Sequence, residues 1–198
     1  MRWIQHWIIG KECLKGRKSL AYQLGCVLPD WFDTHPIHRI KESFSHFLND
    51  AEKTRHLSPG PYRDWKMGNL AHLLCDYCTM AHNDEYYRFY RHRVYEVMAQ
   101  KRFQRERDKG NNCLIAEKDI PIPPALLEST TSAARFKESL SSFILHFIDE
   151  LHREIDKLES QCWFRDERIA ECDTRYAYLL LNALLKILGE EELFKGGE

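Results

Sequence analysis

The chain has 198 residues, which is the size of one ordinary domain. Hydrophobic residues make up 43% and charged residues 30%, so the composition is that of a folded protein and excludes a disordered chain. With 29 basic and 30 acidic residues the formal net charge is −1, which excludes a broadly basic protein that coats nucleic acid. The ten histidines stand out, because so many in one small domain favour a metal site.

The N-terminal segment and the cysteines indicate the compartment. The apolar run at the N-terminus is interrupted by Gln5 and His6 and lacks a small-residue cleavage site, so we read no signal peptide. No stretch reaches the roughly 18 uncharged apolar residues of a membrane span. Seven cysteines without a secretory signal predict reduced thiols and a cytoplasmic protein. Cys75 and Cys78 have zinc-ribbon spacing but no partner pair, and we expect them to be buried structural cysteines.

Apolar residues recur three and four positions apart through almost the whole chain, which is the helical period. In chain order the predicted helices cover about residues 5–15, 39–56, 62–79, 84–106, 136–158 and 169–187. Prolines separate them, and Gly189 is expected to end the last one. We therefore predict an all-α fold, a single-domain bundle of about six or seven helices over residues 1–198. The metal site is expected in about residues 1–106, with helical support from about 125–190.

Six histidines are followed four residues later by an acidic residue. On a helix this spacing places both side chains on one face, where they can bind one cation. The pairs are His38–Glu42, His46–Asp50, His72–Asp76, His92–Glu96, His146–Glu150 and His152–Asp156. Spacing alone does not choose among them, because charge pairing on a solvated helix face gives the same pattern.

The neighbouring residues do distinguish the pairs. His72 and Asp76 lie in a segment of mostly apolar or small residues, so both are expected to be buried. Buried ionisable groups must be paired or must coordinate a metal, and a plain hydrogen bond between the two is the alternative. His146 and His152 lie off the apolar stripe of the long C-terminal helix and are expected on its solvated face.

The order of these motifs resembles a known family. The run Gly68-x3-His72-x3-Asp76-x5-His82, followed by His92-x3-Glu96, resembles the core signature of the zinc-dependent phospholipase C family, which related secreted single-strand nucleases share. Upstream, the segment from Leu24 to Asp30 resembles the Gly-x3-Pro-Asp segment that carries the first aspartate ligand of the family. The opening Trp3-Ile4-Gln5-His6 resembles its N-terminal histidine segment. Together the matching blocks cover about residues 3–100.

This resemblance implies a cluster of zinc ions. One ion takes Asp30, an intervening histidine, His72 and Asp76. A second takes His82, His92 and Glu96 and leaves room for water. A third shares Asp76 as a bridging carboxylate and adds His6. In the secreted members a processed N-terminal tryptophan completes the third site, whereas here Met1 and Arg2 precede Trp3, so we expect two zinc ions and an optional third. The expected metal ligands are His6, Asp30, His38, His72, Asp76, His82, His92 and Glu96.

The intervening histidine has two candidates. His38 follows Asp30 by eight residues, in a short connection that contains Pro36. His46 follows Asp30 by sixteen residues, a spacing nearer that of the secreted enzymes, but it faces away from the apolar positions of its helix. We favour His38.

A zinc pair of this kind implies phosphodiester hydrolysis, with Asp30 and Glu96 as the catalytic residues. The expected substrate is a phospholipid or a small phosphodiester, with transient contact to a membrane surface and no extended nucleic-acid surface. Aromatic residues near the site could hold a quaternary ammonium head group, stack a base or belong to the core: Trp31, Phe32, Tyr86, Tyr87, Phe89 and Tyr90. The alternatives are a single-strand nuclease and a non-catalytic helical metal-binding protein. The sequence does not indicate the oligomeric state.

Overall fold

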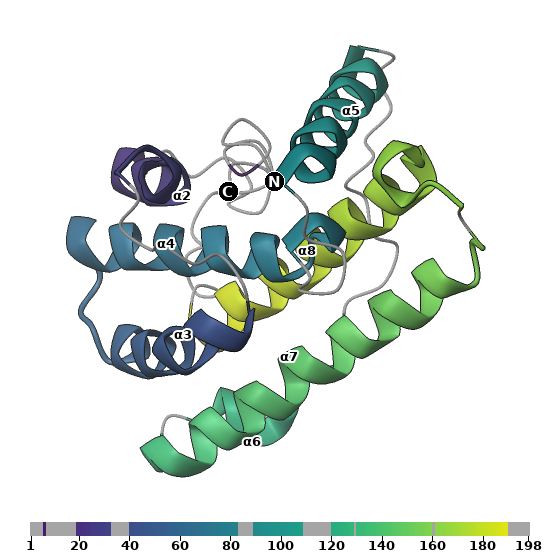
Figure 1. Cartoon of the computed structure of the whole chain (residues 1–198). Helices are drawn as coiled ribbons and strands as arrows, with labels where there is room; N and C mark the ends of the chain where they lie inside the picture. Colours follow the sequence, from purple (N-terminus) through teal and green to yellow (C-terminus); the bar gives the residue numbers. More distant parts are fainter. Residues whose placement is uncertain are drawn as a thin grey trace.

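The computed structural model describes residue 6 and residues 19–32, 40–82, 89–108, 120–128, 130–159 and 161–189. All regular elements of these residues are helical, and Figure 1 shows their arrangement. They are α2 (Leu20–Phe32), α3 (Ile40–Arg55), α4 (Pro61–Tyr77), the short 3₁₀ helix η1 (Met80–His82), α5 (Phe89–Asp108), α6 (Pro124–Leu127), α7 (Ala133–Asp156), the 3₁₀ helix η2 (Trp163–Arg165) and α8 (Glu167–Ile187). The prediction of an all-α fold is confirmed.

Helix α4 is the central element of the bundle. It packs against α2, α3 and α8, and 13 of its 17 residues are buried. A helix covered on several sides needs apolar or small residues around most of its circumference, and the segment from Gly68 to Tyr77 has them. The helix starts at Pro61, whose missing N–H is not needed in a first turn. The polar side chains between Gly68 and Tyr77 are therefore held in a water-poor environment.

Helices α7 and α8 form the helical support that the sequence predicts for the metal site. Each has one buried apolar stripe, and the two stripes pack against one another, while α7 also contacts α3 and α8 contacts α4. Ser132 caps α7 and Asp166 caps α8, each by accepting a hydrogen bond from a backbone N–H of the first turn. Gly189, with φ of 81°, follows the end of α8 as predicted, in the left-handed conformation that favours glycine.

The sequence does not predict helix α2, because a proline such as Pro29 normally marks a break between helices. The proline instead lies near the end of the helix, where it removes only the hydrogen bond to the carbonyl of Gly25. Of the other predicted helices, the one over residues 5–15 lies outside the described residues apart from His6. The helix predicted from residue 84 is described from Phe89 onward. No helix among the described residues is both long enough and apolar enough to cross a membrane.

Candidate metal centre

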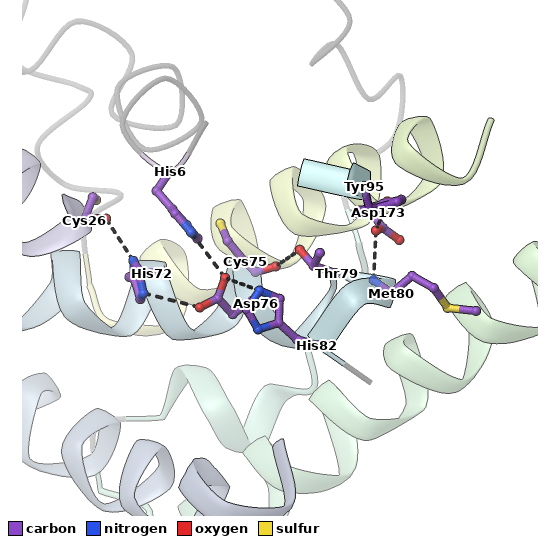
Figure 2. A network of polar contacts seen from close by, with 10 residues as sticks. All are labelled: His6, Cys26, His72, Cys75, Asp76, Thr79, Met80, His82, Tyr95 and Asp173. Carbon is purple, nitrogen blue, oxygen red and sulfur yellow. Dashed lines mark hydrogen bonds and ion pairs between the residues drawn. The ribbon is translucent and has the colours of Figure 1, made fainter. Parts of the chain in front are cut away.

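The site is built on the last two turns of α4. His72 and Asp76 lie one turn apart on this helix, and both side chains are fully buried. The Nε2 atom of His72 lies 3.3 Å from Oδ2 of Asp76. On its other side the imidazole ring meets α2, where Nδ1 of His72 lies 3.0 Å from the backbone carbonyl oxygen of Cys26 (Figure 2). The packing of α2 on α4 therefore fixes the orientation of the His72 ring.

Two more histidines face the other oxygen of Asp76. Nε2 of His6 lies 3.2 Å from Oδ1, and Nε2 of His82, from the short helix η1, lies 3.5 Å from the same atom (Figure 2). His6 is buried, and its ring is 4.2 Å from that of His72 between centroids. The carboxylate of Asp76 thus has His72 on one oxygen and two histidines on the other, which is the arrangement of a bridging carboxylate.

The hydrogen positions on His72 bear on the choice between a metal and a plain hydrogen bond. The Cys26 carbonyl oxygen is only an acceptor, so Nδ1 of His72 must carry the hydrogen and donate it. In the neutral imidazole Nε2 is then an acceptor with its lone pair directed at the carboxylate of Asp76. Two acceptors facing each other in a buried site require a cation between them or a second proton on the ring. A metal ion between His72 and Asp76 meets this need.

Charges within the site favour ligands in their metal-binding forms. Burial alone would raise the pKa of Asp76, but the positive charge that the neighbouring histidines carry when protonated outweighs it and holds that pKa well below its usual range. Asp76 is therefore an anion at neutral pH. The pKa of His6 is lowered mainly by burial and, to a smaller extent, by the neighbouring His72, so its imidazole is neutral. A neutral imidazole and an ionised carboxylate are the forms that bind a metal.

The donor atoms also fit zinc in kind and spacing. Candidate ligand atoms of His6, His72 and Asp76 all lie within 4.8 Å of one another. Two ligands held about 2.0–2.1 Å from a tetrahedral zinc ion lie roughly 3.3 Å apart. The three measured distances between histidine nitrogens and Asp76 oxygens, 3.2, 3.3 and 3.5 Å, are close to this value. Imidazole nitrogen and carboxylate oxygen are both common zinc donors.

The remaining predicted ligands come from α2, α5 and the segment between α2 and α3. Asp30 and His92 lie on α2 and α5, but their side chains are outside the part that the structure describes, and His38 lies outside the described residues altogether. Glu96 is buried on α5, which packs against η1 and α8. As a set, the eight ligands and the catalytic roles of Asp30 and Glu96 stay predictions.

Two other histidine and acid pairs lie on the surface of the described helices. His46 and Asp50 approach to 3.6 Å on α3 with the His46 side chain 57% exposed, and His146 and Glu150 approach to 3.6 Å on α7. His46 is thus not among the described histidines that surround Asp76. Cys75 and Cys78 are both buried, and burial raises the pKa of the Cys78 thiol far above its usual value. The Cys78 thiol therefore resists the deprotonation that zinc binding requires.

The comparison with protein families agrees with this geometry. The family model of zinc-dependent phospholipase C matches residues 6–162, a span that includes His6 and every other predicted ligand. The chain belongs to the zinc-dependent phospholipase C family. Comparisons with curated proteins and with solved structures gave no significant match. The resemblance seen over residues 3–100 therefore extends into α7 and to the residues just before η2.

Sequence reasoning missed two features of this phospholipase C-family site. One is the carbonyl of Cys26, which orients His72 and has no side-chain signal in the sequence. The other is Asp173 on α8, a buried carboxylate that accepts hydrogen bonds from the Met80 backbone and from Tyr95. A signal for Asp173 did exist, because it lies on the apolar stripe of α8, four residues after Ile169 and four before Ala177.

Proposed function

We propose that the chain is a zinc-dependent phosphodiesterase of the phospholipase C type, acting on a phospholipid or a small phosphodiester. The observation that carries this proposal is the placement of three histidines around the single buried carboxylate of Asp76. The orientation of His72 adds to it, because a hydrogen on Nδ1 leaves Nε2 as the ring atom that faces that carboxylate and can bind a metal. Membership of the family supplies the reaction class.

Zinc, when bound, supplies a Lewis acid for phosphoryl oxygens and lowers the pKa of a coordinated water toward about 7. The chain contributes the fixed donors. Asp76 stays ionised and offers one oxygen on each side, and the Cys26 carbonyl holds the proton of His72 on Nδ1 so that Nε2 remains available. Because these groups are buried, their charges act in a low-dielectric environment, where electrostatic interactions are stronger than in water.

The exposure of the ligands suggests where a substrate enters. The side chains of His6, His72 and Asp76 are fully buried, whereas that of His82 is 11% exposed. We expect the phosphate group to approach from the side of His82. Glu96 and Asp30 are proposed to orient the attacking water, in addition to their roles as ligands.

We expect two zinc ions and an optional third. His72 and Asp76 belong with Asp30 and His38 in the first site, and His82, His92 and Glu96 form the second. His6 is assigned to the optional third site, and its closeness to Asp76 also allows it to join the first ion.

The choice between His38 and His46 is tested by a pair of variants. The solvent exposure of His46 and its pairing with Asp50 support His38 as the ligand. His38→Ala should therefore lower zinc content, while His46→Ala should leave it unchanged. The opposite result would assign the ligand to His46.

The function is tested with protein purified without chelator. Zinc per chain is measured by elemental analysis, and activity is followed as phosphocholine released from a chromogenic ester and as diacylglycerol released from phosphatidylcholine vesicles. Hydrolysis that a chelator abolishes and zinc restores supports the proposal. Degradation of single-stranded DNA in place of both substrates would favour the nuclease. Retained zinc with no hydrolysis of any of the three would favour a non-catalytic metal-binding protein.

A further inference from the structure

Asp173 is a buried acid that lies behind the metal site on a different helix. It is on α8, and only 1% of its surface is exposed. Its Oδ2 atom accepts a hydrogen bond of 2.9 Å from the backbone N–H of Met80 and another from the hydroxyl of Tyr95 (Figure 2). Both partners are distant in sequence, separated from Asp173 by 93 and 78 residues. One oxygen atom thus joins three parts of the chain.

Both partners adjoin predicted zinc ligands. Met80 is the first residue of η1, the single turn that ends at His82. Tyr95 directly precedes Glu96 on α5. The two contacts of Asp173 therefore connect the turn carrying His82 to the helix carrying Glu96, which are two of the three ligands assigned to the second zinc ion.

The turn before His82 is held to α4 by its own hydrogen bonds. Thr79 donates from its backbone N–H to the carbonyl of Asp76 and from its hydroxyl to the carbonyl of Cys75, each at 2.9 Å. The backbone N–H of His82 donates in turn to the carbonyl of Thr79, also at 2.9 Å. The turn is thus fixed to α4, while Asp173 attaches it to α5 and α8.

An acid at this position is costly, which argues that it has a role other than packing. Burial raises the pKa of Asp173 to about 7. Its second oxygen, Oδ1, has no hydrogen-bond partner among the described residues. Asp173 also lines a small cavity of about 10 Å³ together with Glu96, Tyr95, Thr79 and others. An apolar residue would avoid the cost of burying a carboxyl group and the cost of leaving Oδ1 without a hydrogen bond. It could not, however, accept hydrogen bonds from Met80 and Tyr95.

We propose that Asp173 is a positioning residue for the second zinc ion, holding the turn that carries His82 in register with the helix that carries Glu96. The inference rests on the proposed function, because it needs His82, His92 and Glu96 to bind one ion. Asp173 itself does not touch the ion. It acts through the backbone of Met80 and the ring of Tyr95, in the way that groups behind metal ligands set their orientation.

The test compares four variants by zinc binding, with no need for a substrate. Zinc per chain is measured after equilibration at stepped concentrations of free zinc, and the melting temperature is measured without zinc. Asp173→Ala removes both hydrogen bonds, Tyr95→Phe removes one, and Asp173→Asn keeps an oxygen that accepts both. Leu181→Ala is the matched control, since Leu181 is also fully buried on α8 and lies two turns beyond Asp173.

We expect Asp173→Ala to weaken the second zinc ion about 10- to 100-fold while leaving the first ion in place, which is the typical effect of losing a group behind a ligand. Tyr95→Phe should weaken the second ion less, and Asp173→Asn should bind it nearly as the unaltered chain does. Leu181→Ala should lower the melting temperature and leave both zinc affinities unchanged.

Several results would overturn the inference. One is a second-ion affinity in Asp173→Ala within twofold of the unaltered chain, and another is an equal loss in Leu181→Ala. If Asp173→Ala does not fold, Tyr95→Phe decides, and unchanged second-ion affinity in that variant overturns the inference. These outcomes leave the proposed function standing. An unaltered chain that takes up no second zinc ion would instead overturn the two-ion site itself, and this inference with it.

Discussion

Gly25 of α2 and Gly68 of α4 are in direct backbone contact at the point where the two helices cross. A Cβ atom on Gly68 would lie 2.2 Å from the carbonyl oxygen of Tyr22 and 2.8 Å from the Cα of Gly25, and real Cβ atoms do not come so close. This close approach brings the carbonyl of Cys26, the residue after Gly25, to Nδ1 of His72. The glycine of the Gly68-x3-His72 motif therefore serves the metal site by allowing α2 to reach it.

Gly68→Ala should destabilise the fold and weaken zinc binding together. Alanine is the better helix former by about 1 kcal/mol, but forcing a side chain into the crossing should cost about 3 kcal/mol, so the clash decides the sign. Urea unfolding and zinc titration measure the two effects. Leu24→Ala is the control, because Leu24 is 42% exposed on α2 and should change stability by less than about 1 kcal/mol. Equal effects of the two variants would show that α2 and α4 do not depend on this contact.

Asp76→Asn should remove more zinc than any other neutralised acid that follows a histidine by four residues. Asp76 faces three imidazoles, so its loss should weaken zinc binding by more than about 100-fold, beyond the 10- to 100-fold typical of groups behind the ligands. Asp50→Asn is the matched control, since Asp50 pairs with the exposed His46 and with Lys66. Elemental analysis of both variants gives the answer. Similar small losses in both would mean that these pairs are only charge pairing.

The contrast between Asp76 and Asp50 also shows how much of the site could be predicted from the sequence. Both acids follow a histidine by four residues, and only the apolar neighbours of His72 separated the buried pair from the surface pair. The pattern of apolar residues also predicted the two C-terminal helices, α7 and α8, because a helix with one solvent-exposed face has a clear apolar stripe on the other. The sequence did not reveal α2, since Pro29 normally marks a helix boundary.

The sequence also did not predict the contacts between segments that are distant along the chain. The bond from His72 to the Cys26 carbonyl depends on a backbone atom, and a backbone atom has no sequence signal. The bonds from Asp173 to Met80 and Tyr95 span more than 70 residues and depend on how α5 and η1 pack against α8. Periodicity predicts which face of a helix is buried, but not which helix covers it.

Asp173 should make stability depend on pH between about 4 and 7. Burial raises its pKa to about 7, so over this range the folded chain holds a proton that the unfolded chain has lost. Its contribution to stability is therefore full below about pH 4 and is lost as the pH rises through 7. Asparagine cannot ionise, so the unaltered chain should lose about 2–3 kcal/mol relative to Asp173→Asn between pH 5 and pH 8.

Urea unfolding of both proteins in the same zinc-containing buffers measures this difference, and titrations that the two proteins share cancel. The expected sign is a stability gap that shifts in favour of Asp173→Asn as the pH rises. A gap that stays constant from pH 5 to pH 8 would mean that Asp173 is ionised in the folded chain throughout.

Glu96→Gln should separate catalysis from folding. Glu96 is buried on α5 and is assigned to the proposed second zinc ion, whose three expected protein ligands would leave a position open for water. Glutamine keeps the shape but removes the charge, so phosphodiester hydrolysis should fall by at least about 100-fold, the scale expected when a group that stabilises developing charge is lost. The large apolar core of α7 and α8 is untouched, and the melting temperature should shift by only about 2–4 °C.

Glu171→Gln is the matched control. Glu171 also connects α8 to α5, through an ion pair of 2.8 Å with Arg102, but its side chain is 59% exposed and far less sensitive to loss of charge. It should keep full activity and zinc content. Hydrolysis of the phosphocholine ester, zinc per chain and melting temperature are measured for both variants. If Glu96→Gln hydrolyses the ester as well as the unaltered chain does, the second ion is not catalytic, and the attacking water must be activated at the site of His72 and Asp76.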